Sequence, residues 1–107
     1  MTINIRAMNM ELTEAIKKYT EEKMTGLEKF YDNIIHIEVD LGLDSNHHNK
    51  GKIYKCSVLV DVPNKLFRIE KQEKDLYKAI DKVKDHLREE ITAWKEKNRE
   101  TLRGTTV

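Results

Sequence analysis

Cysteine, histidine and basic side chains are the groups in this sequence whose positions could support chemistry. Cys56 lies in line with alternating valines. A reactive thiolate needs a partly exposed, electropositive site, so we expect a small buried side chain instead. His47 and His48 are adjacent, but no third Cys, His or carboxylate stands at the ligand spacing of a metal site, although Asp44 is nearby. We therefore expect a solvated loop here and no metal.

Enzyme motifs are missing from the sequence. Its four glycines are scattered, so they form no phosphate-binding loop. No Ser, His and acid arrangement surrounds a nucleophile elbow. The sequence therefore predicts a non-enzymatic protein with no cofactor and no small-molecule substrate.

The composition is that of one charged domain. The chain has 107 residues, and its 20 Lys and Arg nearly balance 19 Asp and Glu. This balance excludes a polycation but not a nucleic-acid binder, because binding depends on where the charges lie. No apolar stretch is long enough to span a membrane, no secretory signal opens the sequence, and a single cysteine fits a reducing compartment. We expect a cytoplasmic protein that does not bind a membrane.

Hydrophobic periodicity predicts six elements. Alternation at period two indicates four strands, at Thr2–Arg6, Ile35–Leu43, Tyr54–Val62 and Leu66–Lys71, with a hairpin turn at Pro63–Lys65 between the last two. Apolar residues at steps of three and four indicate a helix over Thr13–Tyr31 and a long helix after Asp75, with Thr13 and Asp75 as their N-caps. We expect the second helix to fray between Asn98 and Gly104.

The order β-α-β-β-β-α predicts an α+β fold. We expect one four-stranded sheet of antiparallel strands with two helices packed on one face. The other face of the sheet would then be open to water or to a partner. A single domain is expected over residues 1–104, with a disordered tail over 105–107.

The long helix sorts its charges when it is drawn on a wheel at about 100° per residue. One flank is basic and shares its side with a single acid, Asp81, while the far side is mostly acidic. A basic stripe beside an aromatic residue is typical of a surface that tracks phosphates. The alternative is a solvated flank whose long side chains cover the edge of the core. The flank comprises Tyr77, Lys84, Arg88, Lys95 and Arg99.

Two segments carry a family resemblance: Glu22-Lys23-Met24-x-x-Leu27-Glu28-Lys29-Phe30-Tyr31 and Asp75-Leu76-Tyr77-Lys78-Ala79-Ile80-Asp81. Over about Thr2 to Lys97 the chain resembles the ribosome hibernation promoting factors, also called ribosome-associated inhibitors or sigma-54 modulation proteins. The resemblance implies a fold related to double-stranded RNA-binding domains. It also implies a bacterial stress-response protein that binds the small ribosomal subunit and its RNA near the decoding centre. Such a protein inhibits translation by blocking the mRNA and tRNA sites.

The resemblance also implies which residues bind ribosomal RNA. Lys23 and Lys29 match basic positions of the first motif, and Lys95 matches one near the end of the long helix. Tyr77 matches the aromatic of the second motif, where it either packs or contacts RNA. The segment Asp85–Ala93 departs from the family pattern, so the basic surface is expected either to be shifted around the helix or to be weaker. The residues expected to carry that surface are Lys84, Arg88, Lys95 and Arg99.

Two features leave a second hypothesis open. Lys23 falls inside the apolar stripe of its helix, where its ammonium either reaches solvent or marks the entry of a partner between the helices. His36 is expected on the polar side of its strand, either exposed or in contact with a partner. In this hypothesis the chain is a protein-interaction module that binds a partner or a second copy through the open sheet face. That face would present His36, Glu38, Asp40 and Lys55.

Overall fold

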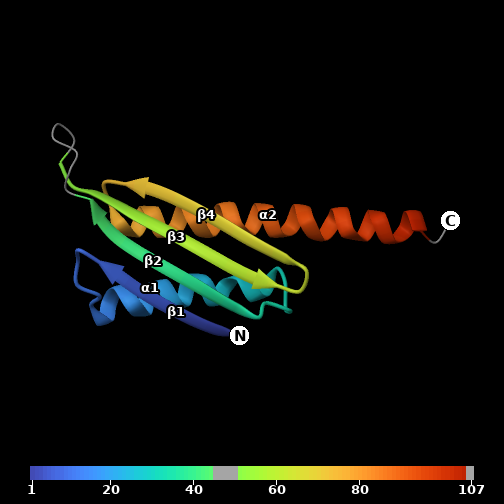
Figure 1. Cartoon of the computed structure of the whole chain (residues 1–107), viewed down its shortest axis with the longest axis horizontal. Helices are drawn as coiled ribbons and strands as arrows, with labels where there is room; N and C mark the ends of the chain where they lie inside the picture. The colour runs from blue at the N-terminus through green and yellow to red at the C-terminus, as the bar shows by residue number, and fades with distance from the viewer. Residues whose placement is uncertain (45–50, 106–107) are drawn as a thin grey trace.

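The computed structural model describes the backbone of residues 1–44 and 51–105 and the side chains of residues 1–44 and 51–97. The strands form one sheet in the order β1-β2-β3-β4, and both helices lie on one face of it (Figure 1). The α+β fold and the predicted order of elements are confirmed. The elements are β1 (Thr2–Met8), α1 (Glu14–Thr25), the short 3-10 helix η1 (Gly26–Lys29), β2 (His36–Asp44), β3 (Ile53–Val62), β4 (Lys65–Glu73) and α2 (Leu76–Thr105).

The sheet is mixed. β1 pairs with β2 in parallel, with Ile3 opposite Ile37, whereas the β2–β3 and β3–β4 pairs are antiparallel. The expectation of antiparallel strands throughout is wrong for β1. Because α1 carries the chain back along the sheet before β2 begins, the two strands must run the same way. Apolar residues alternate with a period of two in parallel and in antiparallel strands alike, so the sequence pattern did not show that β1 is parallel to β2.

A tight turn joins β3 to β4. Val62 and Lys65 are paired across it, which leaves Pro63 and Asn64 as the two central residues. Asn64 has a φ of 68°, and this conformation after a proline is that of a type II turn. The predicted hairpin at this position is confirmed.

The first helix is shorter than expected. Thr13 caps it as predicted, since its Oγ1 accepts a hydrogen bond from the Ile16 backbone N–H at 3.2 Å. The α-helix ends at Thr25, and the chain continues as the 3-10 helix η1 instead of remaining α-helical to Tyr31. A step of three residues, such as Leu27 to Phe30, fits both kinds of helix, so periodicity did not locate this change.

The second helix begins where the sequence predicts. The Asp75 carboxylate accepts a hydrogen bond from the Tyr77 backbone N–H at 2.9 Å. α2 has 30 residues, which at a rise of about 1.5 Å per residue makes it about 45 Å long. It extends past the β3–β4 turn (Figure 1) and remains helical through the region expected to fray. Thr105, expected to belong to the disordered tail, is instead the last residue of α2. Residues 106–107 lie outside the described chain, so a disordered tail over those two residues remains a prediction.

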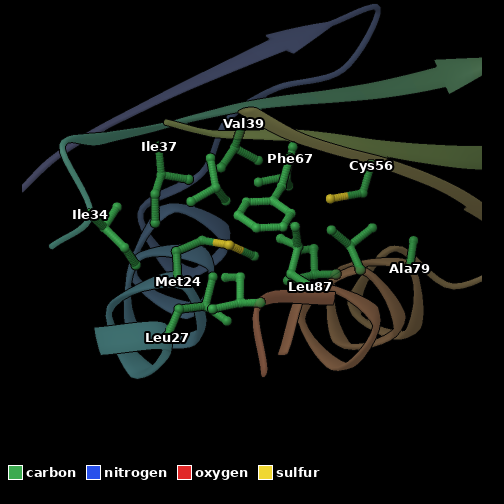
Figure 2. Packing of buried hydrophobic residues seen from close by; sticks show 14 of the residues in the cluster. Met24, Leu27, Ile34, Ile37, Val39, Cys56, Phe67, Ala79 and Leu87 are labelled. Atoms are coloured by element: carbon green, nitrogen blue, oxygen red, sulfur yellow. The ribbon is translucent and has the colours of Figure 1, made fainter. Parts of the chain in front are cut away.

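The core lies between the sheet and the two helices. Inward-facing residues of the strands, among them Val39, Cys56 and Phe67, pack against Met24 of α1, Leu27 of η1 and one stripe of α2 (Figure 2). The apolar stripe of α2 is the one that the spacing of its residues predicts. Trp94 in this stripe is only partly buried, and the other members are at least 94% buried: Leu76, Ile80, Val83, Leu87 and Ile91. This shared core fixes both helices on the sheet and so fixes their position relative to each other.

Cys56 is a structural residue. Its side chain is fully buried, and burial, with a smaller contribution from the charge of Asp40, raises the pKa of its thiol to about 12. A thiol with such a pKa remains protonated at neutral pH, which makes it a poor nucleophile. The prediction of a small buried side chain is confirmed.

Candidate nucleic-acid interface

Basic side chains gather where α1 and η1 meet α2. We call this surface the helix seam and define it by four cations, Lys23, Lys84, Arg88 and Lys95, together with the aromatic residues Tyr19, Phe30, Tyr31 and Tyr77. The two helices run in the same direction along the sheet (Figure 1). Their contacts accordingly proceed from Tyr19 with Asp81 at one end to Phe30 with Lys95 at the other.

Asp81 organises the first end of the seam. Its carboxylate accepts a hydrogen bond from the Tyr19 hydroxyl at 2.6 Å and lies 3.3 Å from Lys23 Nζ. This hydrogen bond is the main reason why the pKa of Tyr19 rises to about 12, with burial the next cause. Lys23 also lies 5.3 Å from the centre of the Tyr19 ring, a cation–π contact. Lys23 therefore belongs to the contact between the helices and remains about one-third exposed.

Tyr77 packs against the same group. Its ring meets that of Tyr19 edge to face, with the centres 4.7 Å apart, a favoured arrangement for aromatic pairs. Tyr77 as a whole residue remains 40% exposed. The packing role that the sequence left open is therefore present in the structure, and RNA contact by the exposed part stays a prediction.

The middle of the seam holds two cations without ion pairs. Lys84 is half-buried and reaches across to the start of η1, where its ammonium lies beside Gly26. The Arg88 guanidinium lies 5.9 Å from the centre of the Phe30 ring. Among the residues that the structure describes, neither side chain has an acidic partner within 4.0 Å. Their positive charges are held in place without being neutralised, which is what a phosphate-binding surface needs.

Lys95 closes the other end of the seam. Its ammonium donates a hydrogen bond of 2.6 Å to the Phe30 carbonyl and lies 6.0 Å from the centre of the Tyr31 ring. Because Phe30 follows directly on η1, this bond satisfies a carbonyl that the end of a helix leaves free. Lys95, expected to bind RNA, thus has a structural role within the chain.

The remaining predicted cations are placed differently. Lys29 is exposed on η1, and no described contact joins it to α2. The side chain of Arg99 lies outside the described residues. The structure thus brings together Lys23, Lys84, Arg88 and Lys95 from the predicted set. The contributions of Tyr19, Gly26 and Phe30 were missed, because contacts between residues about 60 positions apart leave no signal in local periodicity.

The opposite face of the sheet carries charges of both signs. We call it the outer sheet face, formed by the strand residues that point away from the helices. Arg6 makes two hydrogen bonds to the Asp40 carboxylate, at 2.9 and 3.3 Å. His36 Nδ1 lies 3.4 Å from Asp61, a partner on the neighbouring strand that the sequence did not reveal. Lys55 and Glu70 are 4.0 Å apart. The charges on this face are thus largely paired with one another.

Metal ligands do not gather in the described part of the chain, which holds no group of three His, Cys, Asp or Glu side chains placed to share an ion. His47 and His48 lie outside it. Within the same ranges no helix is long and apolar enough to cross a membrane.

Several curated proteins match this chain in sequence, some over about half of their own length and one over nearly all of it. A ribosome hibernation promotion factor of Deinococcus radiodurans is 32% identical over 87 residues, which are 81% of this chain and 45% of the relative. One from Bacillus subtilis is 30% identical over 97 residues, or 91% of this chain and 50% of the relative. The chain thus spans about half the length of these curated relatives. A ribosome hibernation promoting factor of Pseudomonas putida, 25% identical over 104 residues, is covered to 96% of its length.

Solved structures match the fold. The N-terminal domain of Protein Y from Thermus thermophilus superimposes with a TM-score of 0.77 at 30% identity, over 88% of this chain and 99% of that domain. A ribosomal subunit interface protein from Coxiella burnetii gives a TM-score of 0.79 at 18% identity, which shows the fold alone. The family model described as Sigma 54 modulation protein / S30EA ribosomal protein matches residues 3–99. The chain belongs to this family.

Proposed function

We propose that this chain is a ribosome-associated hibernation factor of the cytoplasm, and that its helix seam binds RNA of the small ribosomal subunit. Two observations support the proposal. The relatives that match over most of this chain are named ribosome hibernation promotion or promoting factors. The seam also presents Lys84 beside Gly26 and Arg88 beside the Phe30 ring, neither with an acidic partner among the described residues, and this second observation carries the residue-level proposal.

Phosphate contact explains how the seam would act. Lysine and arginine contacts to phosphates position a protein on RNA without reading the base sequence. The protein is elongated, with extents of 58 × 28 × 18 Å, and both sides of the seam are fixed by one packed core. Bound near the decoding centre, such a rigid body would occupy the space that mRNA and tRNA need. Translation would stop through occupancy, with no chemical step.

Co-sedimentation with small ribosomal subunits tests the proposal. We expect the purified chain to pellet with subunits from its own source at low salt, and to be released steeply as salt rises, because phosphate contacts displace bound counterions. Addition of the chain to an in vitro translation reaction should lower its output in parallel with binding. If the chain stays in the supernatant at low salt, the proposed function is wrong.

A second candidate function rests on the outer sheet face. The helices leave this face uncovered, and two large apolar side chains on it are strongly exposed, Met8 at 72% and Leu66 at 59%. Met8 and Leu66 lie on the two edge strands, β1 and β4, of this uncovered face, which is the surface that a protein partner or a second copy would contact. Analytical ultracentrifugation separates the two functions. A concentration-dependent dimer together with unchanged ribosome profiles would favour this second function over the first.

A further inference from the structure

Gly26 and Lys84 face each other across the helix seam. A Cβ atom at position 26 would lie 3.0 Å from Lys84 Nζ and 3.4 Å from its Cε. The first of these distances is tighter than most Cβ contacts, so the ammonium would have to move slightly to make room for a Cβ atom at position 26, and farther for a longer side chain. Gly26 comes from the first third of the chain and Lys84 from α2, so their contact exists only in the folded protein.

The backbone at position 26 does not itself require glycine. Gly26 has a φ of −60° and a ψ of −19°, ordinary helical values that any L residue adopts. Glycine at such a position is a poor helix former compared with alanine. The chain thus keeps a residue that weakens the junction of α1 and η1, and what the residue provides there is room.

The position is also electrostatically suited to an ammonium group. Gly26 is the C-cap of α1, and the C-terminal end of a helix attracts cations. Lys84 is held there without an ion pair among the described residues, so its charge stays available to a ligand. It lies one helical turn before Arg88, which the Phe30 ring holds on the same seam.

We propose that Gly26 is a positioning residue for Lys84, which it admits to the junction of α1 and η1 so that the ammonium lies in line with Arg88 for phosphate binding. The inference rests on the proposed function for its ligand, but the placement of Lys84 can be tested without ribosomes. Gly26→Met fills the space with a flexible side chain, and Gly26→Ala is the smaller change that is least able to disturb folding.

The first measurement concerns placement alone. Each protein is treated briefly with acetic anhydride, and the modification of individual lysines is followed by mass spectrometry, with exposed Lys29 as the internal reference. We expect Lys84 of Gly26→Met to react about threefold faster than in the wild type, because it is pushed out of a half-buried position. Gly42→Ala is the matched control, since its added Cβ would approach only the Met8 carbonyl oxygen, at 3.9 Å. Unchanged reactivity of Lys84 in Gly26→Met would overturn the inference, whatever the ribosome assay shows.

The second measurement is a double-mutant cycle of binding to small ribosomal subunits. We expect Lys84→Ala to weaken binding about tenfold and Gly26→Met about fivefold. In each variant the slope of the logarithm of the binding constant against the logarithm of the salt concentration should become shallower by about the amount that one phosphate contact contributes. In the Lys84→Ala background, Gly26→Met should cause no further loss, since it acts through that lysine. Gly26→Ala should lower affinity while the melting temperature is unchanged or higher, which a purely structural role would not produce. An equal loss in both backgrounds would show that Gly26 does not act through Lys84. A wild-type chain that fails to bind would refute the proposed function and leave the labelling result to decide the placement.

Discussion

The helix seam and the outer sheet face both present charged side chains, but they use them differently. On the outer face Arg6, His36 and Lys55 each lie beside a carboxylate on a neighbouring strand. In the seam, Lys84 and Arg88 lie against a glycine and an aromatic ring instead. A phosphate that approaches the outer face must compete with acids already in place, whereas in the middle of the seam it meets two cations that have no acidic partner among the described residues. The near-neutral net charge of the chain therefore says little about the charge distribution on either surface.

The largest effect should come from reversing the charges of Lys84 and Arg88 in the middle of the seam. We expect Lys84→Glu combined with Arg88→Glu to weaken binding to small ribosomal subunits by about 100-fold at low salt, because two attractive contacts become repulsive. Quantitative co-sedimentation measures this loss, and thermal unfolding checks that the fold survives.

A charge-matched variant on the outer sheet face serves as the control. Lys55→Glu combined with Arg68→Glu changes the net charge by the same amount on exposed positions of β3 and β4. It should retain binding within about twofold, because a charge change far from the bound phosphates is largely screened. If both variants lose binding equally, net charge and not the seam determines affinity, and the comparison fails.

Cys56 lies in the core between the two regions and should affect stability at high pH without changing either surface. Burial raises its pKa from 9.0 to about 12. The raised value stabilises the fold fully below pH 9, and this contribution is lost as pH rises from 9 toward 12, by up to about 1.4 kcal/mol per pH unit. Urea unfolding at several pH values should show a shallower decline for Cys56→Ala, after its constant cavity cost is subtracted. Parallel curves for the two proteins would contradict the assignment.

Asp75 stabilises the helix that carries most of the seam. Asp75→Ala removes the side-chain acceptor for the Tyr77 N–H, and loss of such a cap costs about 1 kcal/mol. Hydrogen exchange should become faster in the first turn of α2, while the strands that form the outer sheet face keep their protection. A uniform increase over sheet and helix would show that the cap acts only on global stability.

The smallest effect is expected from the acid in the seam. Asp81→Asn removes a negative charge and the ion pair to Lys23, so binding to the small subunit should tighten about threefold. The pKa of Tyr19 should fall from about 12 toward its ordinary value, because the hydrogen bond to a carboxylate is lost. An ultraviolet titration of tyrosine ionisation measures this shift. Weaker binding by the variant would mean that Asp81 is needed to hold Lys23 in place.

Local signals in the sequence predicted much of this molecule. Thr13 and Asp75 identified the starts of both helices because capping depends on nearby residues, and the spacing from Leu76 to Ile91 identified the buried stripe of α2. The basic flank follows from the same wheel. Residue spacing did not reveal which way β1 runs beside β2, since that depends on the path of the intervening chain.

The contacts within the helix seam could not be predicted from local sequence patterns either, because they join residues that are far apart in the sequence. The bond from Lys95 to the Phe30 carbonyl spans 65 residues, and that from Tyr19 to Asp81 spans 62. Gly26 lies within the segment predicted as the first helix, and no local pattern there indicates its contact with Lys84, which is far away in the sequence. The contact of His36 with Asp61 joins two neighbouring strands, so the local sequence around His36 did not indicate it.

The same long separations set an order of events during synthesis. The residues of α1, η1 and all four strands are synthesised before those of α2, so the seam has only one side until Lys84, Arg88 and Lys95 have been added and have folded against α1 and η1. Contacts of this sequence separation form late, since they require a large loop to close. If the seam is the ribosome-binding surface, a growing chain lacks the means to inhibit the ribosome that makes it until α2 has nearly all emerged.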